Sequence, residues 1–398
     1  MNKLNYLLLS AAAVAALPAC QPTEEIPPPE HATAPVIQQA SVIGQGYEFA
    51  GNGKVHDTEG QEELYELAAL EDFSADLLNE ELVSGLKRQL RVIKYFKKRN
   101  KEQFGELKVT YHELEATIQL LLNQYEAGHH TLPSNIAAHR IKGEDGLGNV
   151  HFTGYFTPVL KVSRQKDDVY KYPLYTRPKK WKGKLPTRAQ IDGEGALAEM
   201  GLELAYAKNL VDIYFMQVQG SGIVEFEDGS SQLFAHDGSN SHPYSSIGHY
   251  MVEQGYTTPD RVSLKSIRKF FERQPELLEK ILFINKSYIF FTPSNSGPKG
   301  AGLAELSPNY SIAVDTRYIP MGSCLLAKVP IINKRNQVIR HEYRLLMAQD
   351  IGGAIKGPGH VDLYTGVGYK GQRMASALHH YGSLWLLLPE QKQQLAVR

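Results

Sequence analysis

Two acidic residues, Asp350 and Asp362, lie close together in a glycine-rich part of the chain. Asp350 ends the apolar run YRLLMAQD, and Asp362 sits between Val361 and Leu363. If this segment is a strand, Asp362 leaves one face while its apolar neighbours leave the other. Apolar surroundings raise the pKa of a carboxyl group, and a carboxyl with a raised pKa can act as a general acid near neutral pH.

The glycines between the two acids allow the chain to turn sharply and to approach a bulky ligand closely. Two acids that leave the same sheet edge would then reach one cleft. The spacing alone fits a second interpretation equally well, in which Asp350 brackets a turn and Asp362 is an ordinary surface residue.

Other kinds of site find less support in the residues. The pairs His129-His130 and His379-His380 would point to opposite faces of a strand, and no H-E-x-x-H sequence occurs, so a zinc site is not expected. The segment DIGGAIKG lacks the spacing of a phosphate-binding loop, and the chain has no G-x-S-x-G motif. We therefore predict neither a metal nor a cofactor.

The overall composition also narrows the class of protein. The chain has 398 residues, and its 43 basic and 43 acidic side chains cancel. Nucleic acid is therefore not predicted as a partner, because its binding depends on electrostatic attraction. The 34 glycines, 21 prolines and 22 tyrosines favour a protein rich in turns and strands over a helical bundle.

The N-terminus, MNKLNYLLLSAAAVAALPAC, predicts an export signal over residues 1–19, too short to span a membrane. The run from Leu17 to Cys20 resembles the lipobox of bacterial lipoproteins, which predicts a lipid anchor on Cys20. Gln21 at the next position predicts the outer membrane, facing the periplasm. The alternative is an ordinary secreted protein with a chance cysteine. Residues 20–44, rich in proline and poor in bulky apolar residues, are expected to form a disordered tether.

The pattern of apolar residues changes along the chain. A helical period runs from Leu64 to Lys98 and again from Tyr111 to Tyr125. From Asn149 onward most apolar runs are strand-like, including DIYFMQVQGSG, with a helical excursion near Val262 to Arg273 and Pro275 to Phe283. Beyond Ser287, strands of barrel length alternate with glycine and proline turns.

Six motifs, in this order, make a family resemblance specific. They are TGYFTP (Thr153–Pro158), MQVQGSG (Met216–Gly222), YSSIG (Tyr244–Gly248), AVDTRYIPMG (Ala313–Gly322), AQDIGGAIKG (Ala348–Gly357) and VDLYTGVG (Val361–Gly368). Together they resemble the MltA family of membrane-bound lytic transglycosylases. The resemblance implies a mainly β fold with some α: a double-psi β-barrel domain, an inserted second β-barrel domain, N-terminal helices and a groove between the two barrels. We expect the first domain, with its helices, over residues 45–158 and 284–398, and the insert over 159–283.

The resemblance also assigns roles to residues. It implies that Asp362 is the catalytic acid, that Asp350 orients and tunes the site, and that Asp315 is structural. Substrate contacts are expected from Thr153, Gly154 and Tyr155 at the crossing between the domains, from Gln219, Gly220 and Ser221 of the insert, and from Lys356. Hinge geometry alone is the other interpretation of Gly154, and a solvated loop lysine that of Lys356. His360 is assigned no proton transfer.

The implied reaction cleaves the β-1,4 bond between N-acetylmuramic acid and N-acetylglucosamine in peptidoglycan glycan strands and leaves a 1,6-anhydromuramyl end. The implied enzyme is a lyase of the exotransglycosylase type, although the residues do not distinguish cleavage at chain ends from internal cleavage. They also leave open membership of a wall-synthesis complex. Two alternatives remain at this point: a hydrolase of the lysozyme type, which activates water, and a non-catalytic peptidoglycan-binding lipoprotein.

Overall fold

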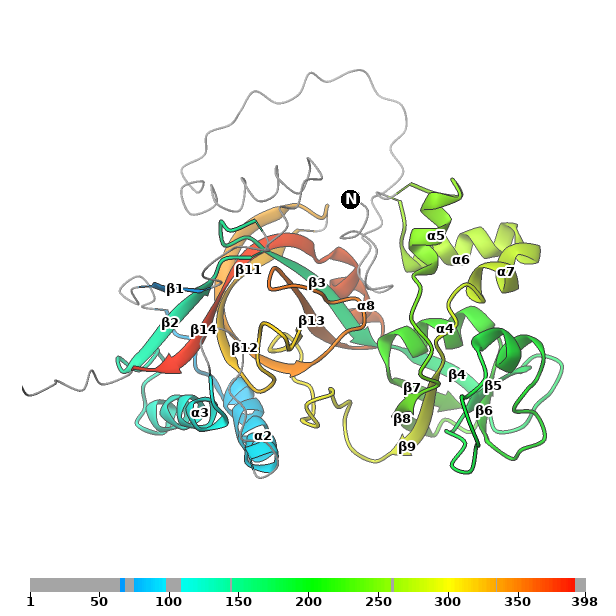
Figure 1. Cartoon of the computed structure of the whole chain (residues 1–398), viewed down its shortest axis with the longest axis horizontal. Coiled ribbons are helices and arrows are strands. Elements are labelled where there is room, and N and C mark those ends of the chain that lie inside the picture. Colours follow the sequence, from blue (N-terminus) through cyan, green and yellow to red (C-terminus); the bar gives the residue numbers. More distant parts are fainter. Residues whose placement is uncertain are drawn as a thin grey trace, which may run out of the picture.

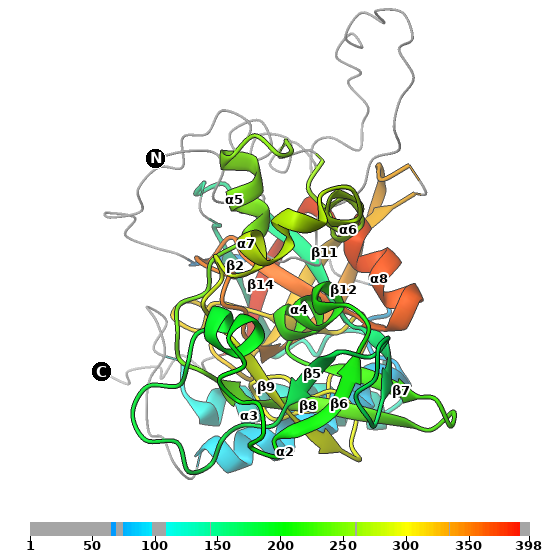
Figure 2. The same ribbon diagram turned by 90° about the vertical axis from the view of Figure 1, so that its right-hand side faces the viewer.

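The computed structural model describes residues 65–68, 75–97, 109–143, 145–258, 261–333 and 335–390. The predicted signal, the tether and Cys20 therefore lie outside the described residues. Within the described ranges, no helix has the length and apolar character needed to cross a membrane. The described chain forms two β-sheet bodies that lie side by side, with the polypeptide crossing between them (Figure 1 and Figure 2).

The first body is an eight-stranded sheet, six strands of which close into a ring. Its strands are β1 (Tyr65–Ala68), β2 (Ile136–Ile141), β3 (Val150–Thr157), β10 (Ser311–Ala313), β11 (Cys324–Ile332), β12 (Val338–Asp350), β13 (His360–Val367) and β14 (His379–Pro389). The ring runs β14-β11-β12-β10-β13-β3 and returns to β14, while β2 and β1 extend the sheet from β14. Parallel pairing joins β10 to β12 and β13 to β3. This closed sheet confirms the predicted barrel.

Two helices, α2 (Glu80–Lys97) and α3 (Tyr111–Glu126), pack against each other and against the barrel. Helix α3 begins at Tyr111, as predicted, and ends one residue later than predicted; a capping box between Thr110 and Glu113 begins it. The expected helix from Leu64 is wrong at its start, because β1 pairs there with β2. The side chain of Asn79 accepts a hydrogen bond from the Leu82 amide and begins α2 only at the next residue.

The second body is a six-stranded sheet with helices beside it. Its strands are β4 (Val159–Ser163), β5 (Tyr172–Tyr175), β6 (Glu203–Ala207), β7 (Gly222–Phe226), β8 (Ser231–Ser239) and β9 (Ile289–Ser294), in the order β5-β6-β4-β7-β8-β9. Its helices are α4 (Leu210–Gln219), α5 (Ile247–Glu253), α6 (Leu264–Arg273) and α7 (Leu278–Leu282), with short π and 3-10 turns at Ala189–Gly193 and Pro275–Leu277. Because β9 belongs to this sheet, the sheet extends past residue 283, where we expected the insert to end.

The apolar residues of the run DIYFMQVQGSG predicted a strand. Its residues Asp212–Gln219 instead belong to helix α4. Seven of the ten residues of this helix are buried and the other three are half-buried, so the helix has no exposed face from which a helical period could be read. Gly220 ends the helix at a φ of 83°, in the left-handed region that favours glycine. The helical segments predicted near Val262 to Arg273 and Pro275 to Phe283 are confirmed as α6 and as the 3-10 turn followed by α7.

Candidate active site

Asp362 lies in the barrel wall next to Thr153. The parallel register of β13 and β3 places the two residues opposite each other, and Thr153 Oγ1 donates a hydrogen bond of 2.9 Å to Asp362 Oδ1. The side chain of Asp362 is only 5% exposed. Burial raises its pKa to about 7, the Thr153 hydrogen bond acts against this, and the negative charge of Asp350 adds to it. Asp362 can therefore carry a proton at neutral pH.

The short strand β10 brings Asp350 to the same place. Ala313 of this strand is the register partner of Asp350 on β12 and also of Asp362 on β13. Both carboxyl groups therefore approach one spot from either side of a strand whose residue there is small. This arrangement confirms the inference that the two acids share a cleft, since both line the same pocket.

Three donors hold the carboxyl group of Asp350. Its Oδ2 accepts from the Tyr155 hydroxyl at 2.9 Å, and its Oδ1 accepts from the Ala301 and Ile351 amides at 2.8 and 2.9 Å. Burial raises the pKa of Asp350 above its usual value, although these hydrogen bonds favour the charged form. The three donors fix the orientation of the carboxylate and favour its charged form.

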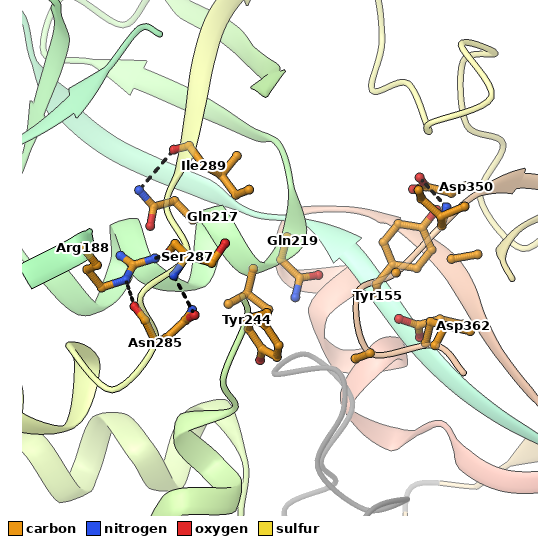
Figure 3. Close-up of a pocket in the computed structure, with 17 residues that line it drawn as sticks. Tyr155, Arg188, Gln217, Gln219, Tyr244, Asn285, Ser287, Ile289, Asp350 and Asp362 are labelled. Atoms are coloured by element: carbon orange, nitrogen blue, oxygen red, sulfur yellow. Dashed lines mark hydrogen bonds between the residues drawn. The ribbon is translucent and has the colours of Figure 1, made fainter. Parts of the chain in front are cut away.

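The pocket between the two sheets has a volume of about 220 Å³. The barrel contributes Tyr155, Ala313, Asp350, Asp362 and the segment 351–355, while the insert contributes Arg188, Gln217, Val218, Gln219, Tyr244, Asn285, Ser287 and Ile289. Figure 3 shows the two acids and Tyr155 on one side and the polar side chains of the insert on the other. Acid chemistry and polar recognition thus come from different sheets.

Asp315 fixes the loop that joins the two acids. Its Oδ2 accepts a hydrogen bond of 3.0 Å from the Gly357 amide, and Arg317 forms an ion pair with the same carboxylate. Burial alone would raise the pKa of Asp315, but the hydrogen bonds from Arg317 and Gly357 outweigh it and lower the pKa. These contacts are what a structural role of Asp315 requires.

Comparisons with known proteins agree with this architecture. The family model of the MltA specific insert domain matches residues 151–292, and that of the 3D domain matches residues 310–388. Membrane-bound lytic murein transglycosylase A of Vibrio cholerae is 41% identical over 275 residues, which cover 65% of this chain and 74% of that protein. The chain belongs to the MltA family. The Escherichia coli K12 protein of the same name is 40% identical over 256 residues, covering 63% and 69% of the two chains.

Solved structures of MltA proteins share the fold. E. coli MltA with bound chitohexaose has a TM-score of 0.69 and 31% identity, covering 83% of this chain and 95% of that chain. The membrane-bound lytic murein transglycosylase from Agrobacterium tumefaciens has a TM-score of 0.68 and 25% identity, covering 82% and 97%. The predicted combination of a double-psi barrel and an inserted β domain is therefore confirmed as that of the MltA family.

The other predicted site residues of this MltA-family chain differ in whether they line the pocket that holds the two acids. Tyr155 and Gln219 line the pocket, whereas Gly220, Ser221 and Lys356 are not among the lining residues. Gln219 Oε1 accepts a hydrogen bond of 3.0 Å from the Phe156 amide, so it ties the end of α4 to the crossing from β3 to β4. Lys356 is exposed on the loop after Ile355. Substrate contacts of Gly220, Ser221 and Lys356 stay predictions.

Gly154 faces a helix and does not line the pocket. A Cβ atom at this position would lie 2.7 Å from the Cα atom of Ala375, which belongs to helix α8 (Gly368–Ala377). The close approach of α8 to β3 therefore accounts for the glycine without any contact to a sugar. Helix α8 lies in the part of the chain beyond Ser287, where the apolar pattern predicts only strands and turns.

Sequence reasoning missed the polar wall of the insert. Arg188 is 1% exposed and donates hydrogen bonds to the carbonyl oxygens of Asn285 and Ser287, at 3.1 and 2.7 Å. It also pairs with Asp192, and it thereby holds the 285–287 segment that lines the pocket. Tyr244, also in the lining, lies in the YSSIG motif, which carried the family resemblance but no assigned role. No local pattern pointed to Arg188.

Proposed function

We propose that Asp362 is the single acid and base of a lytic transglycosylase reaction on peptidoglycan. As a member of the MltA family, the protein is a peptidoglycan lytic transglycosylase, which is an enzyme of the lyase type. The observation that carries the assignment to Asp362 is its burial in a pocket between two sheets, with a pKa raised to about 7. Such a group holds a proton at neutral pH and can also release it.

In the proposed mechanism, protonated Asp362 donates its proton to the glycosidic oxygen between N-acetylmuramic acid and N-acetylglucosamine. The C1–O bond breaks through an oxocarbenium-like state, and the N-acetylglucosamine leaves with a hydroxyl group. The Asp362 carboxylate then takes the proton from the C6 hydroxyl of the muramyl residue as O6 bonds to C1. The product is a 1,6-anhydro ring, and Asp362 is protonated again without any water being consumed.

Asp350 supports this cycle through its charge. Its three hydrogen-bond donors fix a negative charge near Asp362, and that charge raises the pKa of the acid. The same charge favours the positive oxocarbenium-like state. Because three donors hold the Asp350 carboxylate in place and favour its charged form, it is a poor candidate for the water-activating base that a lysozyme-type hydrolase requires. Tyr155 supports the electrostatic role of Asp350, because its hydroxyl group donates a hydrogen bond that orients the Asp350 carboxylate.

On the insert side, Gln219, Tyr244 and Ser287 offer amide and hydroxyl groups suited to sugar hydroxyl and N-acetyl groups. The solved E. coli structure contains a chitohexaose, a sugar polymer, and supports a glycan as the ligand of this pocket. We assign Thr153 to holding Asp362 and not to contacting sugar, since its hydroxyl group faces the carboxyl.

The reaction can be tested by digesting purified peptidoglycan in ¹⁸O-labelled water and analysing the muropeptides by mass spectrometry. We expect anhydromuramyl ends without label, because the attacking oxygen comes from the sugar. Labelled reducing ends would show hydrolysis and would replace the one-acid mechanism. An Asp362→Asn variant, with the exposed Asp168→Asn as matched control, should yield no product, while the control retains full activity.

The relatives are membrane-bound proteins by name, and this chain shares that association. We propose that a lipid on Cys20 provides it, in the outer membrane and facing the periplasm, on the basis of the run Leu17–Cys20 and Gln21. A Cys20→Ala variant should move to the soluble fraction, while Cys324→Ala should stay with the membrane. Membership of a wall-synthesis complex is a further proposal, which in-cell cross-linking of the anchored protein would test.

A further inference from the structure

Three histidines, of which His151 and His360 are buried and His379 is half-buried, lie next to Thr153, and none of them lines the pocket. His360 Nε2 is 3.0 Å from the hydroxyl oxygen of Thr153, and the imidazole rings of His360 and His151 are stacked 5.0 Å apart. His151 Nε2 in turn lies 3.0 Å from His379 Nδ1. Burial lowers the pKa of His360 to about 3 and that of His379 to about 4, so both rings are neutral at working pH. The proposed mechanism gives this cluster no role.

The contact between His360 and Thr153 restricts where hydrogen atoms can lie. The Thr153 hydroxyl has one hydrogen to donate, and Asp362 Oδ1 accepts it at 2.9 Å. The 3.0 Å contact to His360 is then satisfied only if Nε2 carries the hydrogen and donates it to Thr153. The Thr153 hydroxyl group cannot then donate to His360, so its hydrogen stays directed at the Asp362 carboxyl group. Among the described residues, the hydrogen-bond partner of the Asp362 carboxyl group is the Thr153 hydroxyl group.

We propose that His360 is a positioning residue for the acid: by donating to Thr153, it keeps Asp362 Oδ1 an acceptor and confines the catalytic proton to Oδ2. This inference rests on the proposed role of Asp362. The Oδ2 atom is the oxygen that remains for the substrate, so the proton is held where the glycosidic bond needs it. The geometry assigns His360 no proton transfer of its own, because a neutral ring that donates through Nε2 already holds its hydrogen.

Without His360 the hydrogen-bond chain can reverse. The Thr153 hydroxyl could turn toward the Val361 carbonyl oxygen, which lies 3.5 Å away, and then accept a proton from Asp362 Oδ1. That arrangement stabilises a protonated acid whose proton points away from the sugar. Loss of His360 should therefore lower kcat and raise the pKa of Asp362, while substrate binding is unaffected.

Few other groups can influence the titration of Asp362. Facing it or its partner Thr153 are Asp350 on β12, Tyr155 on β3, His360 on β13 and His379 on β14. Strand β10 has the sequence Ser-Ile-Ala and no titratable side chain, and the cations of α8, Lys370 and Arg373, are exposed. Replacement of neutral His360 removes no charge, so a change in the pH profile must come through the hydrogen bonds.

The first test compares variants of the full chain on soluble glycan strands of peptidoglycan. For His360→Phe we expect a kcat about tenfold lower, the scale of one hydrogen bond, with KM within about twofold of wild type. The falling limb of the pH profile should move upward by about half to one pH unit. His360→Gln retains an N–H donor and should restore both parameters. His341→Phe is the matched control, because His341 bonds the Tyr381 carbonyl oxygen elsewhere in the barrel.

A double-variant cycle separates this role from simple packing. In a Thr153→Val background the hydroxyl is absent, so His360→Phe should cause no further change in kcat or in the pH profile. An equal loss in both backgrounds would overturn the proposal, as would an unshifted profile in the single variant. If these outcomes occur while Asp362→Asn is inactive, only the role of His360 fails. If Asp362→Asn remains active, the proposed function itself fails.

A second measurement requires only the folded wild-type chain. Long-range ¹H–¹⁵N correlation spectra of ¹⁵N-histidine-labelled protein distinguish a protonated Nε2 from a protonated Nδ1, and His360→Gln assigns the signal. We expect His360 to carry its hydrogen on Nε2 throughout the pH range in which Asp362 titrates. A hydrogen on Nδ1 would overturn the proposal even if the phenylalanine variant did not fold.

Discussion

Replacing the acid Asp362 with asparagine should stabilise the protein, but only at neutral and alkaline pH. Asparagine has nearly the shape of the protonated acid, and its Oδ1 can still accept the hydrogen bond from Thr153. It cannot ionise, whereas wild-type Asp362 must lose its proton inside the barrel wall as the pH rises. The two proteins should therefore differ most where Asp362 is charged.

The magnitude follows from the shift in pKa. Burial raises the pKa of Asp362 from 3.8 to about 7, and each pH unit corresponds to about 1.4 kcal/mol. Because the folded state has the higher pKa, this carboxyl contributes its full stability below pH 4 and loses it progressively up to pH 7. The free energy of unfolding of Asp362→Asn should therefore exceed that of wild type by up to about 4 kcal/mol above pH 7, and by almost nothing at pH 4.

The assay is thermal or urea unfolding of both proteins from pH 4 to pH 8, with Asp168→Asn as an exposed control. We expect the midpoint temperature of Asp362→Asn to rise above wild type by several degrees at pH 8 and to coincide with it at pH 4. Equal curves at pH 8 would refute the reasoning, because they would mean that Asp362 ionises without penalty. A uniform difference at every pH would point to altered packing and not to titration.

Three further predictions concern the surroundings of the acid. Asp350→Asn removes a negative charge near Asp362, so the pKa of Asp362 should fall, and a pH profile of kcat/KM should show its falling limb at lower pH. Gly154→Ala places a Cβ 2.7 Å from the Ala375 Cα and should lower the free energy of unfolding by about 1–3 kcal/mol, measured in urea against Gly353→Ala, where nothing lies within 4 Å. EDTA should leave turnover unchanged, since in the described part of the chain no three His, Cys, Asp or Glu side chains are grouped to hold a metal; loss of activity that a divalent ion restores would contradict this.

The acids and the barrel strands could be predicted because their signals are local. Strands such as β11 and β14 contain short apolar runs bounded by turn residues, and Asp350 and Asp362 stand within motifs that can be read without knowing what lies opposite. Their meeting at one pocket was only one of the two interpretations that the spacing allowed, and the pocket lining decides in its favour. The position of Ala313 between the two acids could not be predicted, because it depends on the pairing of β10 with both β12 and β13.

Features that depend on contacts between residues far apart in the sequence could not be predicted. Helix α4 is buried on nearly every side, so its residues look like a strand until the sheet around it is known. His360 meets Thr153 across 207 positions of sequence, and Arg188 meets Ser287 across 99. Neither pair has a periodic pattern, because a hydrogen bond between two neighbouring strands or loops leaves no mark on the residues beside each partner in sequence.

The insertion of one sheet within the other fits the proposed mechanism, in which a single acid is sufficient. Strand β3 passes through Pro158 directly into β4, and the chain returns from β9 to the barrel, so two connections restrain the insert relative to Asp362. Gln219 adds a hydrogen bond to this crossing at Phe156. One carboxyl group that must both give and take a proton needs the two sugar oxygens brought to it in turn, within hydrogen-bond reach. A glycan held by the insert can meet that requirement only if the insert is held firmly against the barrel.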